Sequence, residues 1–261
     1  MSLNGQRIAV VLPAYNAART LQRTVAELDR TVVDALILVD DSSTDNTWQV
    51  AEQLSSLGVQ RIQHPNNQGY GANQKTCYGI ALEQGADVIV MVHPDYQYSP
   101  RLVPAMAAMI AYSEYDLVLG SRILAQNAVR AGMPRYKYAA NRGLTLFENV
   151  LIRAKLSEYH TGLRAYSRSL LLAIPFRHNS DDFVFDNQVL VQSLRAGARI
   201  GEVSCPTRYN QDSSSISFRR SVTYGIGVCR TALEYRLQAQ GWRSYPYLAE
   251  VSPLRDSGMG Q

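Results

Sequence analysis

The sequence of 261 residues lacks several features that would assign it to a particular class of protein. It has only three cysteines, Cys77, Cys205 and Cys229, and an odd number at wide spacing gives neither a disulfide framework nor a zinc motif. It has no apolar stretch near the ~18–20 residues needed to cross a bilayer, and its first apolar run, IAVVL, is too short for a signal peptide. We therefore expect a protein of the reducing cytoplasm that does not span a membrane by itself.

The sequence also has little excess charge and no cluster of it. Lys and Arg together number 26 against 22 Asp and Glu, which gives a formal net charge of +4. No run of Lys or Arg and no RNA- or DNA-binding signature accompanies this charge, so we expect no nucleic-acid partner. A mildly basic protein instead suits anionic partners such as nucleotide phosphates, lipid phosphates or a membrane surface.

What the sequence does contain, over its first half, is a regular alternation of apolar runs and helical patterns. The apolar runs, each expected to be a strand, are RIAVVLP (7–13), ALILVDD (35–41), VQRIQHP (59–65), ADVIVMVHPD (86–95) and YDLVLGSR (115–122). The helical patterns between them cover residues 18–32, 47–58, 71–85 and 99–113. This alternation predicts an α/β fold, a Rossmann-like and mostly parallel sheet with helices on both faces.

After Arg122 the pattern changes. We expect a helix around residues 139–155, a strand within 198–209, and a basic amphipathic helix over 218–240. The apolar face of the last helix is formed by Val222, Ile226, Cys229 and Leu233, and its positive charge by Arg219, Arg220, Arg230 and Arg236. Such a helix either lies on an anionic membrane or packs on the core of the protein.

Polar residues follow each of the five expected strands of the first half, at 13–16, 40–43, 66–71, 93–97 and 120–122. In open α/β sheets, ligands bind outside the carboxyl ends of the strands. We therefore expect these five clusters to converge on one edge of the sheet and to form a binding site there.

Two of the clusters have an ordinary structural explanation beside a functional one. Asp40 and Asp41 stand where an apolar strand stops, and neighbouring carboxylates repel unless one meets a donor or a metal ion. Either one of them accepts hydrogen bonds from a ribose or base, or Asp41 and the serines after it cap the next helix. Gly69 and Gly71 allow either the close approach of a ligand or a tight turn.

The fourth cluster, which contains His93, Asp95 and Gln97, carries the most chemistry. Alternate residues of an extended chain point the same way, so an imidazole, a carboxylate and an amide would face one cation. A divalent ion there would bridge a diphosphate and stabilise a leaving nucleotide. The alternative is a structural loop in which His93 is simply hydrogen-bonded.

Taken in order, the motifs of residues 7–220 resemble family 2 glycosyltransferases of the GT-A fold, and among these the dolichyl- or polyprenyl-phosphate sugar synthases. The matching stretches are VLPAYNA, LVDDSSTDNT, HPNNQGYGANQKT, VMVHPDYQYSP, GSR, HTGLRAYSR, FVFDNQ and EVSCPTRY. The resemblance implies an enzyme, an inverting hexosyltransferase that moves a sugar from a UDP- or GDP-sugar to a polyprenyl or dolichyl phosphate. We expect residues 1–217 to form the nucleotide-sugar-binding and catalytic domain, and 218–261 a C-terminal amphipathic helical appendage and tail.

The resemblance also implies roles for individual residues. Those implied to hold the nucleotide are Pro13, Tyr15, Asn16, Asp40, Asp41, Gly69 and Asn73. Those implied to hold Mg²⁺ or Mn²⁺ on the diphosphate are Asp95 and Gln97, with His93 as a further candidate. Arg122 is implied to meet a phosphate of the donor or the acceptor, and Lys137, Asn141 and Arg142 are implied to contact the phosphate of an acceptor lipid. Residues 213–217 with Arg219 form either a lid with phosphate contacts or a plain surface loop.

The implied reaction needs few catalytic groups. Asp95, through the metal ion, and Arg122 would neutralise the departing diphosphate. A lipid phosphate acceptor is already an anion, whereas a sugar hydroxyl needs a carboxylate to accept its proton. Asp186 is the candidate for that base, with Asp182 behind it. The alternative is that Asp186 orients a neighbouring loop.

Two positions depart from the family pattern. Ala17 stands where the family usually has Glu, and His93 where it has the first Asp of the metal motif. Imidazole suits Mn²⁺ better than Mg²⁺, which prefers oxygen ligands. The departures motivate one alternative, a weakly active nucleotide-sugar-binding protein. A second alternative is a glycosyltransferase that acts on a soluble hydroxyl acceptor, a metabolite or glycan. With a lipid acceptor, we expect a peripheral position at the inner face of the membrane.

Overall fold

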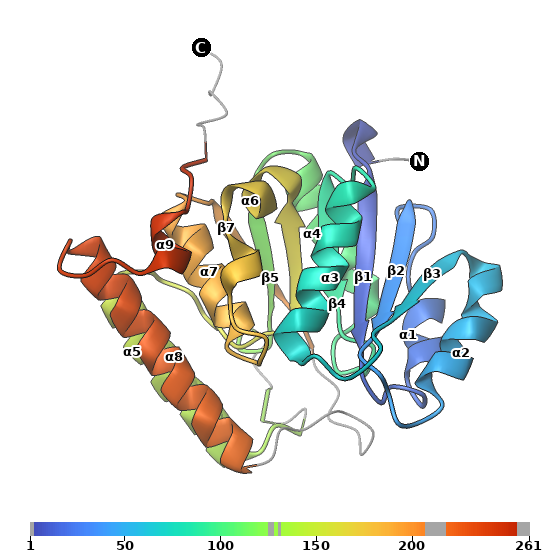
Figure 1. Ribbon diagram of the computed structural model, residues 1–261, viewed down its shortest axis with the longest axis horizontal. Helices are drawn as coiled ribbons and strands as arrows, with labels where there is room; N and C mark the ends of the chain where they lie inside the picture. Colours follow the sequence, from blue (N-terminus) through green and yellow to red (C-terminus); the bar gives the residue numbers. More distant parts are fainter. Residues whose placement is uncertain (1–2, 125–127, 130–131, 207–217, 255–261) are drawn as a thin grey trace.

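The computed structural model describes residues 3–124, 128–129, 132–206 and 218–254. A seven-stranded sheet runs through the molecule in the order β3-β2-β1-β4-β6-β5-β7, with helices on both of its faces (Figure 1). The strands are β1 (Ile8–Ala14), β2 (Ala35–Asp40), β3 (Val59–Gln63), β4 (Val88–Val92), β5 (Leu117–Ser121), β6 (Leu163–Ser167) and β7 (Ile200–Ser204). The predicted α/β fold with a mostly parallel sheet is confirmed.

The alternation of side chains along β1 shows why both faces of the sheet need a cover. Ile8, Val10 and Leu12 belong to a core shared with α1 (Leu21–Ala26), α2 (Thr47–Gln53) and α4 (Val103–Ala111). Ala9 and Val11 belong to a second core with α3 (Tyr70–Glu83), α6 (Arg168–Ala173) and α7 (Phe185–Arg195). The side chains on both sides of β1 are therefore apolar and both faces of the sheet are covered by helices, as the continuous apolar runs predict.

β6 is the strand that sequence analysis missed, along with the helices α6, α7 and α9 (Pro246–Ala249), and it is the only antiparallel strand among those described. It pairs with β4 on one side and β5 on the other, with Leu163 opposite Val92. Its direction is reversed, so the chain enters the sheet at the edge where β4 and β5 end. The segment 158–162 is thereby placed at the predicted ligand edge.

Several helices are shorter than their sequence patterns. The pattern over 18–32 forms a helix only at Leu21–Ala26, and that over 99–113 divides into a 3₁₀ turn, Pro100–Leu102, and α4. The pattern over 47–58 likewise forms α2 and then a 3₁₀ turn, Leu54–Leu57. The expected helix near 139–155 is longer at its start, since α5 covers Arg135–Ile152.

The long helix α8 (Phe218–Ala239) lies alongside α5 at one end of the molecule, and the short helix α9 (Pro246–Ala249) follows it (Figure 1). Val228 and Ala232 of α8 are fully buried, whereas Val222, Ile226 and Leu233 are exposed. One side of α8 therefore packs on the protein and the other carries apolar side chains in solvent. No helix in the described part of the chain has both the length and the apolar character needed to cross a bilayer.

Candidate active site

A cavity of about 420 Å³ opens at the carboxyl ends of β4 and β5 and is walled by α5, α7 and α8. Its lining includes the predicted site residues His93, Asp95, Gln97, Arg122, Lys137, Asn141 and Asp186. It also includes residues that sequence analysis did not single out, among them Tyr70, His160, Arg164, Phe183 and Tyr224. The structure thus brings the predicted metal, phosphate and base candidates to one place.

The segment that carries the predicted metal ligands is a turn, whereas sequence analysis predicts an extended chain. β4 ends at Val92, and Tyr96 adopts a left-handed conformation with φ of 57°. The turn lets the Gln97 amide N–H donate to the Asp95 carboxylate over 3.0 Å. The strict alternation that would aim three side chains at one cation is therefore absent.

His93 is committed to a protein partner. Its Nε2 lies 2.8 Å from the Tyr70 hydroxyl, and its ring stacks on the Tyr70 ring. Burial lowers the pKa of His93, although the nearby Asp95 and Asp186 act in the other direction. A neutral His93 donating from Nε2 to the Tyr70 oxygen satisfies both groups.

The remaining donors suit a particular kind of metal site. No group of three or more His, Cys, Asp or Glu side chains in the described residues is arranged to hold a metal ion. Asp95 and Gln97 supply a carboxylate and an amide oxygen to the cavity. Such a donor set fits a hard cation that takes most of its ligands from phosphate and water.

Asp186 has one oxygen bound and one without a partner. Its Oδ2 accepts a hydrogen bond of 2.6 Å from the Tyr70 hydroxyl, while its buried Oδ1 has no hydrogen-bond partner in the described structure. The side chain projects from the first turn of α7 into the cavity. Asp182, the predicted second candidate, is exposed and bonds the amide of its own neighbour, Phe183. The geometry therefore favours Asp186 over Asp182 as a base.

Arg122 is already paired with a buried carboxylate. Its guanidinium and backbone N–H both bind Glu158, which is fully buried and also accepts from Asn141 over 2.8 Å. Burial alone would raise the pKa of Glu158, but the charge and hydrogen bonds of Arg122 lower it. Arg122 lines the cavity as half of an ion pair, so the positive charge that it offers a phosphate is reduced.

The other cations separate into those that reach the cavity and those that do not. Lys137 lines the cavity, and no hydrogen bond or ion pair of its ammonium is found within the described residues. Arg142 is exposed, lies outside the cavity lining and donates to the Ser157 carbonyl over 3.0 Å. Arg164 lines the cavity from β6 and is fully buried, with its guanidinium bonded to the carbonyls of Tyr159, Thr161 and Asp186.

The predicted nucleoside residues lie together at the ends of β1 and β2. Tyr15 is half exposed, at 50%. Asn16 has a left-handed backbone and binds the Thr44 amide through its side chain over 2.9 Å. Asp40 is fully buried and accepts from Ser43 and from Gln63. Pro13, at the end of β1, pairs with Val39 of β2.

Asp41 does not cap the next helix, the structural role that sequence analysis considers for it. Its carboxylate accepts from the backbone N–H groups of Gln68 and Gly69 over 2.9 Å and lies 2.7 Å from His64 Nδ1. Asp45, rather than Asp41, receives the first N–H of α2, from Thr47. Asp41 therefore holds the loop between β3 and α3 in place.

The glycines of that loop meet protein rather than open space. A side chain at Gly69 or Gly71 would collide with the backbone of residues 180–181, and the Gly71 amide donates to the Asp181 carbonyl over 2.7 Å. Asn73 is buried and donates to the carbonyls of Ala14 and Val39. These residues form a tight seam between the nucleotide edge and the start of α7.

Residues 213–217, predicted as a lid or surface loop, lie outside the described residues, while Arg219 is exposed near the start of α8.

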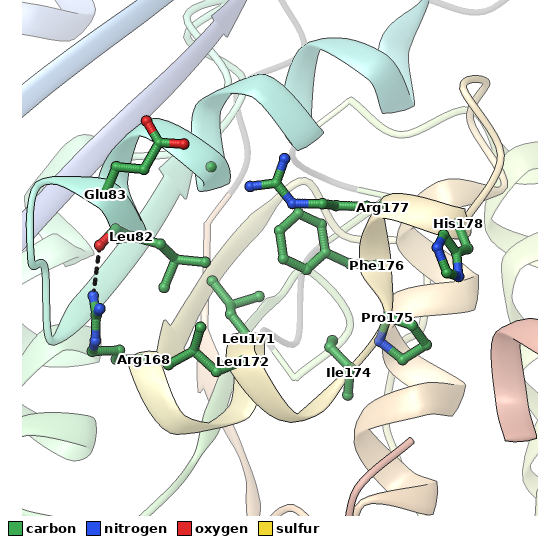
Figure 2. Close-up of a pocket in the computed structure, with 11 residues that line it drawn as sticks. Leu82, Glu83, Arg168, Leu171, Leu172, Ile174, Pro175, Phe176, Arg177 and His178 are labelled. Carbon is green, nitrogen blue, oxygen red and sulfur yellow. Dashed lines mark hydrogen bonds between the residues drawn. The ribbon is translucent and has the colours of Figure 1, made fainter. Parts of the chain in front are cut away.

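A second cavity of about 460 Å³ lies between α3 and α6 and shares no lining residue with the first. Figure 2 shows its apolar floor and Arg168, which is committed to the Leu82 carbonyl.

Comparison with known proteins agrees with this architecture. The family described as Glycosyl transferase family 2 matches residues 9–174. A UDP-N-acetylglucosamine–dolichyl-phosphate N-acetylglucosaminyltransferase of Methanococcus voltae is 28% identical over 220 residues, covering 79% of this chain and 87% of that protein. A dolichyl-phosphate hexose transferase of Haloferax volcanii is 27% identical over 234 residues, covering 88% and 96%.

Solved structures show the same fold. Glucosyl-3-phosphoglycerate synthase from Mycobacterium tuberculosis with uridine diphosphate has a TM-score of 0.68 at 20% identity, covering 89% of this chain and 80% of that one. The same enzyme with Mn²⁺, uridine diphosphate and phosphoglyceric acid has a TM-score of 0.66 at 20% identity, covering 89% and 79%.

The strand order and the likeness to these structures show the GT-A fold. The chain belongs to glycosyl transferase family 2, because the family match covers more than half of its length.

Proposed function

We propose that this enzyme is an inverting hexosyltransferase that moves a sugar from a UDP- or GDP-sugar to a polyprenyl or dolichyl phosphate. The observation that carries the proposal is the composition of the cavity. The cavity is lined by the carboxylates of Asp95 and Asp186 and the ammonium of Lys137, together with a set of apolar side chains on or next to α5, α7 and α8. The apolar lining residues are Met133, Ala140, Leu144, Phe183 and Val222. A phosphate on an isoprenoid chain matches that combination, and the two dolichyl-phosphate relatives support it.

At the donor end, we assign Pro13, Tyr15, Asn16 and Asp40, at the ends of β1 and β2, to the binding of the nucleoside. Asp95 and Gln97 would hold Mg²⁺ or Mn²⁺ against the diphosphate, and the ion would supply positive charge to the leaving nucleotide. The related structure that contains Mn²⁺ and uridine diphosphate supports a divalent cation. His93 holds Tyr70, and Tyr70 in turn fixes Asp186.

At the acceptor end, Lys137 meets the acceptor phosphate, and Arg122 with Asn141 shapes the site through Glu158. A phosphate oxygen is already negatively charged, so attack on the anomeric carbon needs no proton transfer. Arg142 lies outside the cavity, so its predicted phosphate contact is not part of this proposal.

The decisive experiment is transfer of a labelled sugar followed by extraction into organic solvent. UDP- and GDP-sugars are offered with polyprenyl phosphate in detergent, and a lipid product is expected in the organic phase. Lys137→Ala should reduce its formation, whereas Lys155→Ala, an exposed lysine outside the cavity, should not. Labelled product that stays in water would sink the lipid acceptor.

A soluble hydroxyl acceptor is the second candidate, and one observation favours it. The Oδ1 atom of Asp186 is buried, lacks a partner in the described structure and is the atom that a general base needs. The solved structure of similar fold that contains phosphoglyceric acid supports this alternative as well. Product in the aqueous phase, lost on Asp186→Asn, would establish this alternative.

A weakly active nucleotide-sugar-binding protein remains the alternative that Ala17 and His93 motivate. Calorimetry with UDP and GDP, with and without Mn²⁺, tests it together with the metal site. Binding of one nucleotide that weakens with chelator and with Asp95→Ala supports the donor site. Binding without turnover on any acceptor would favour the binding protein.

For a lipid acceptor, we also propose a peripheral contact with the inner face of the membrane. Leu146 and Val150 of α5 and Ile226 of α8 are each about two-thirds exposed, near exposed arginines such as Arg230. Together with the cavity wall they make 218–254 part of the acceptor region rather than a detached tail. Flotation with anionic vesicles should fall for Ile226→Glu and not for Leu57→Glu, an exposed leucine beside α2.

A further inference from the structure

A line of buried polar side chains leads from α5 to the acceptor end of the cavity, and the proposed transfer does not use it. Glu148 of α5 is fully buried, and its Oε1 accepts from the Asn187 amide. Its Oε2 lies 3.4 Å from Nε2 of His160, whose Nδ1 lies 2.9 Å from the hydroxyl of Tyr224. Tyr224 belongs to α8 and lines the cavity.

The facing atoms of Glu148 and His160 need each other. Within the described structure, neither Glu148 Oε2 nor His160 Nε2 has a hydrogen-bond partner, and both are buried. A separation of 3.4 Å exceeds an ordinary hydrogen bond by about 0.5 Å, which a small side-chain rotation closes. A buried polar atom without a partner is costly, so contact between the two is favoured.

The protonation states fix the direction of the chain. Burial raises the pKa of Glu148 to about 8, although Asn187 and Arg164 oppose it, and burial lowers the pKa of His160 to about 4. At neutral pH the carboxyl is protonated and the imidazole is neutral. Because Oε1 already accepts from Asn187, the carboxyl proton lies on Oε2 and is donated to Nε2 of His160. The imidazole proton is then on Nδ1 and is donated to the Tyr224 oxygen.

The hydroxyl proton of Tyr224 is left to point into the cavity. We propose that Glu148 and His160 are positioning residues that make Tyr224 present a hydrogen-bond donor to an oxygen of the acceptor. When Glu148 ionises, it accepts from Nε2, the chain reverses, and the Tyr224 proton turns to Nδ1 of His160. The inference rests on the proposed function only in naming the acceptor as the group that receives this bond.

Several other titratable and charged groups of the described residues lie near this chain. Arg164 of β6 and Arg122 stay cationic, and burial raises the pKa values of Cys229 on α8 and Tyr159 beside His160, so both stay neutral. The carboxylates near the chain are Glu158, which Arg122 holds ionised, and Asp186 of α7.

Nitrogen NMR of labelled histidine tests the direction without any turnover. The chain has four histidines, and His160→Asn identifies the signal of His160. At pH 7 we expect the Nδ1–H tautomer in the wild type, changing to Nε2–H as pH rises through about 8. In Glu148→Gln the amide NH₂ donates to Nε2 at every pH, so the tautomer should stay Nδ1–H. An Nε2–H tautomer at pH 7 in both proteins would overturn the inference.

Acceptor kinetics provide the functional arm. From pH 7 to 9 the wild-type kcat/KM for the acceptor should fall about tenfold, because one hydrogen bond to the acceptor is lost. Glu148→Gln should abolish that fall. Tyr224→Phe should be about tenfold slower at pH 7 and lack the fall, with nucleotide affinity unchanged. Tyr112→Phe, an exposed tyrosine beside α4, is the matched control. Transfer with an unaltered pH profile in Glu148→Gln would overturn the inference, whereas transfer to no acceptor would instead overturn the proposed function.

Discussion

The buried carboxylates of the nucleotide edge and those of the acceptor cavity differ in how completely they are bonded. Asp40 and Asp41, at the end of β2, have every oxygen occupied by protein donors. Glu148 and Asp186, beside the cavity, each keep a buried oxygen without a partner in the described structure. The first pair stabilises loops whose hydrogen bonds form within the protein itself. The second pair still has carboxylate oxygens that can bond to a ligand.

The largest effect expected from this difference is on stability, at the nucleotide edge. Asp41→Ala leaves His64 and the amides of Gln68 and Gly69 without their buried acceptor. We expect the free energy of unfolding to fall by about 3–5 kcal/mol, as for other broken buried pairs. Urea unfolding measures it, and a loss below about 1 kcal/mol would contradict the view that this edge is held by Asp41.

The next effect is on transfer, in the cavity. If the acceptor is a hydroxyl, Asp186→Asn keeps the bond from Tyr70 but removes the base, so we expect about a 100-fold loss of kcat. The substitution also removes a negative charge that stabilises the buried Arg164 guanidinium, so urea unfolding is measured beside the rate. Asp29→Asn, on an exposed turn before β2, is the control. A normal rate with a hydroxyl acceptor would remove Asp186 from the mechanism.

A smaller effect is expected at Lys137, a cavity cation for which no hydrogen bond or ion pair is found in the described structure. Lys137→Ala should raise the KM for a phosphate-bearing acceptor by about tenfold, since one charge-assisted hydrogen bond is lost. Nucleotide affinity should stay within twofold of the wild type. An unchanged acceptor KM beside a weakened nucleotide would move Lys137 to the donor side.

The smallest effect concerns Glu148 and is visible only as a dependence on pH. The folded protein keeps the Glu148 proton up to about pH 8, above the unfolded value near 4.5, so ionisation of this group destabilises the fold as pH rises. His160 titrates below about pH 6.5 and does not interfere above it. Between pH 6.5 and 8, the free energy of unfolding of Glu148→Gln should therefore rise relative to that of the wild type by on the order of 1 kcal/mol per pH unit. Parallel stability curves for the two proteins would show that Glu148 is ionised already.

The sequence predicts one half of this picture better than the other, for physical reasons. The strands around Val11 and Leu38 are continuous apolar runs, and the polar clusters after them must converge in a parallel sheet. β6 could not be predicted because its sequence, LRAYS, contains the buried Arg164 and because the sequence gives no sign that the strand is antiparallel.

The bonding inside the site was the part that spacing did not predict. Tyr70, His93 and Asp186 meet from three elements that are far apart in the chain, so no short motif announces their contact. Glu158 gave no signal for the same reason, because its partner Arg122 is 36 residues away. The sequence singles out the pair Asp40 and Asp41, but the contacts of Asp41 depend on the position of residues 64–69, which the local sequence does not reveal.

The seam at Gly69 and Gly71 bears on how the enzyme could be rebuilt by exchange of parts. The two glycines contact the backbone of residues 180–181, a few residues before Asp186. The loop before α3 and the loop before α7 therefore fit closely against each other. A chimaera that joins this nucleotide half to the acceptor half of a relative will fit only if residues 69–71 and 180–181 come from the same parent.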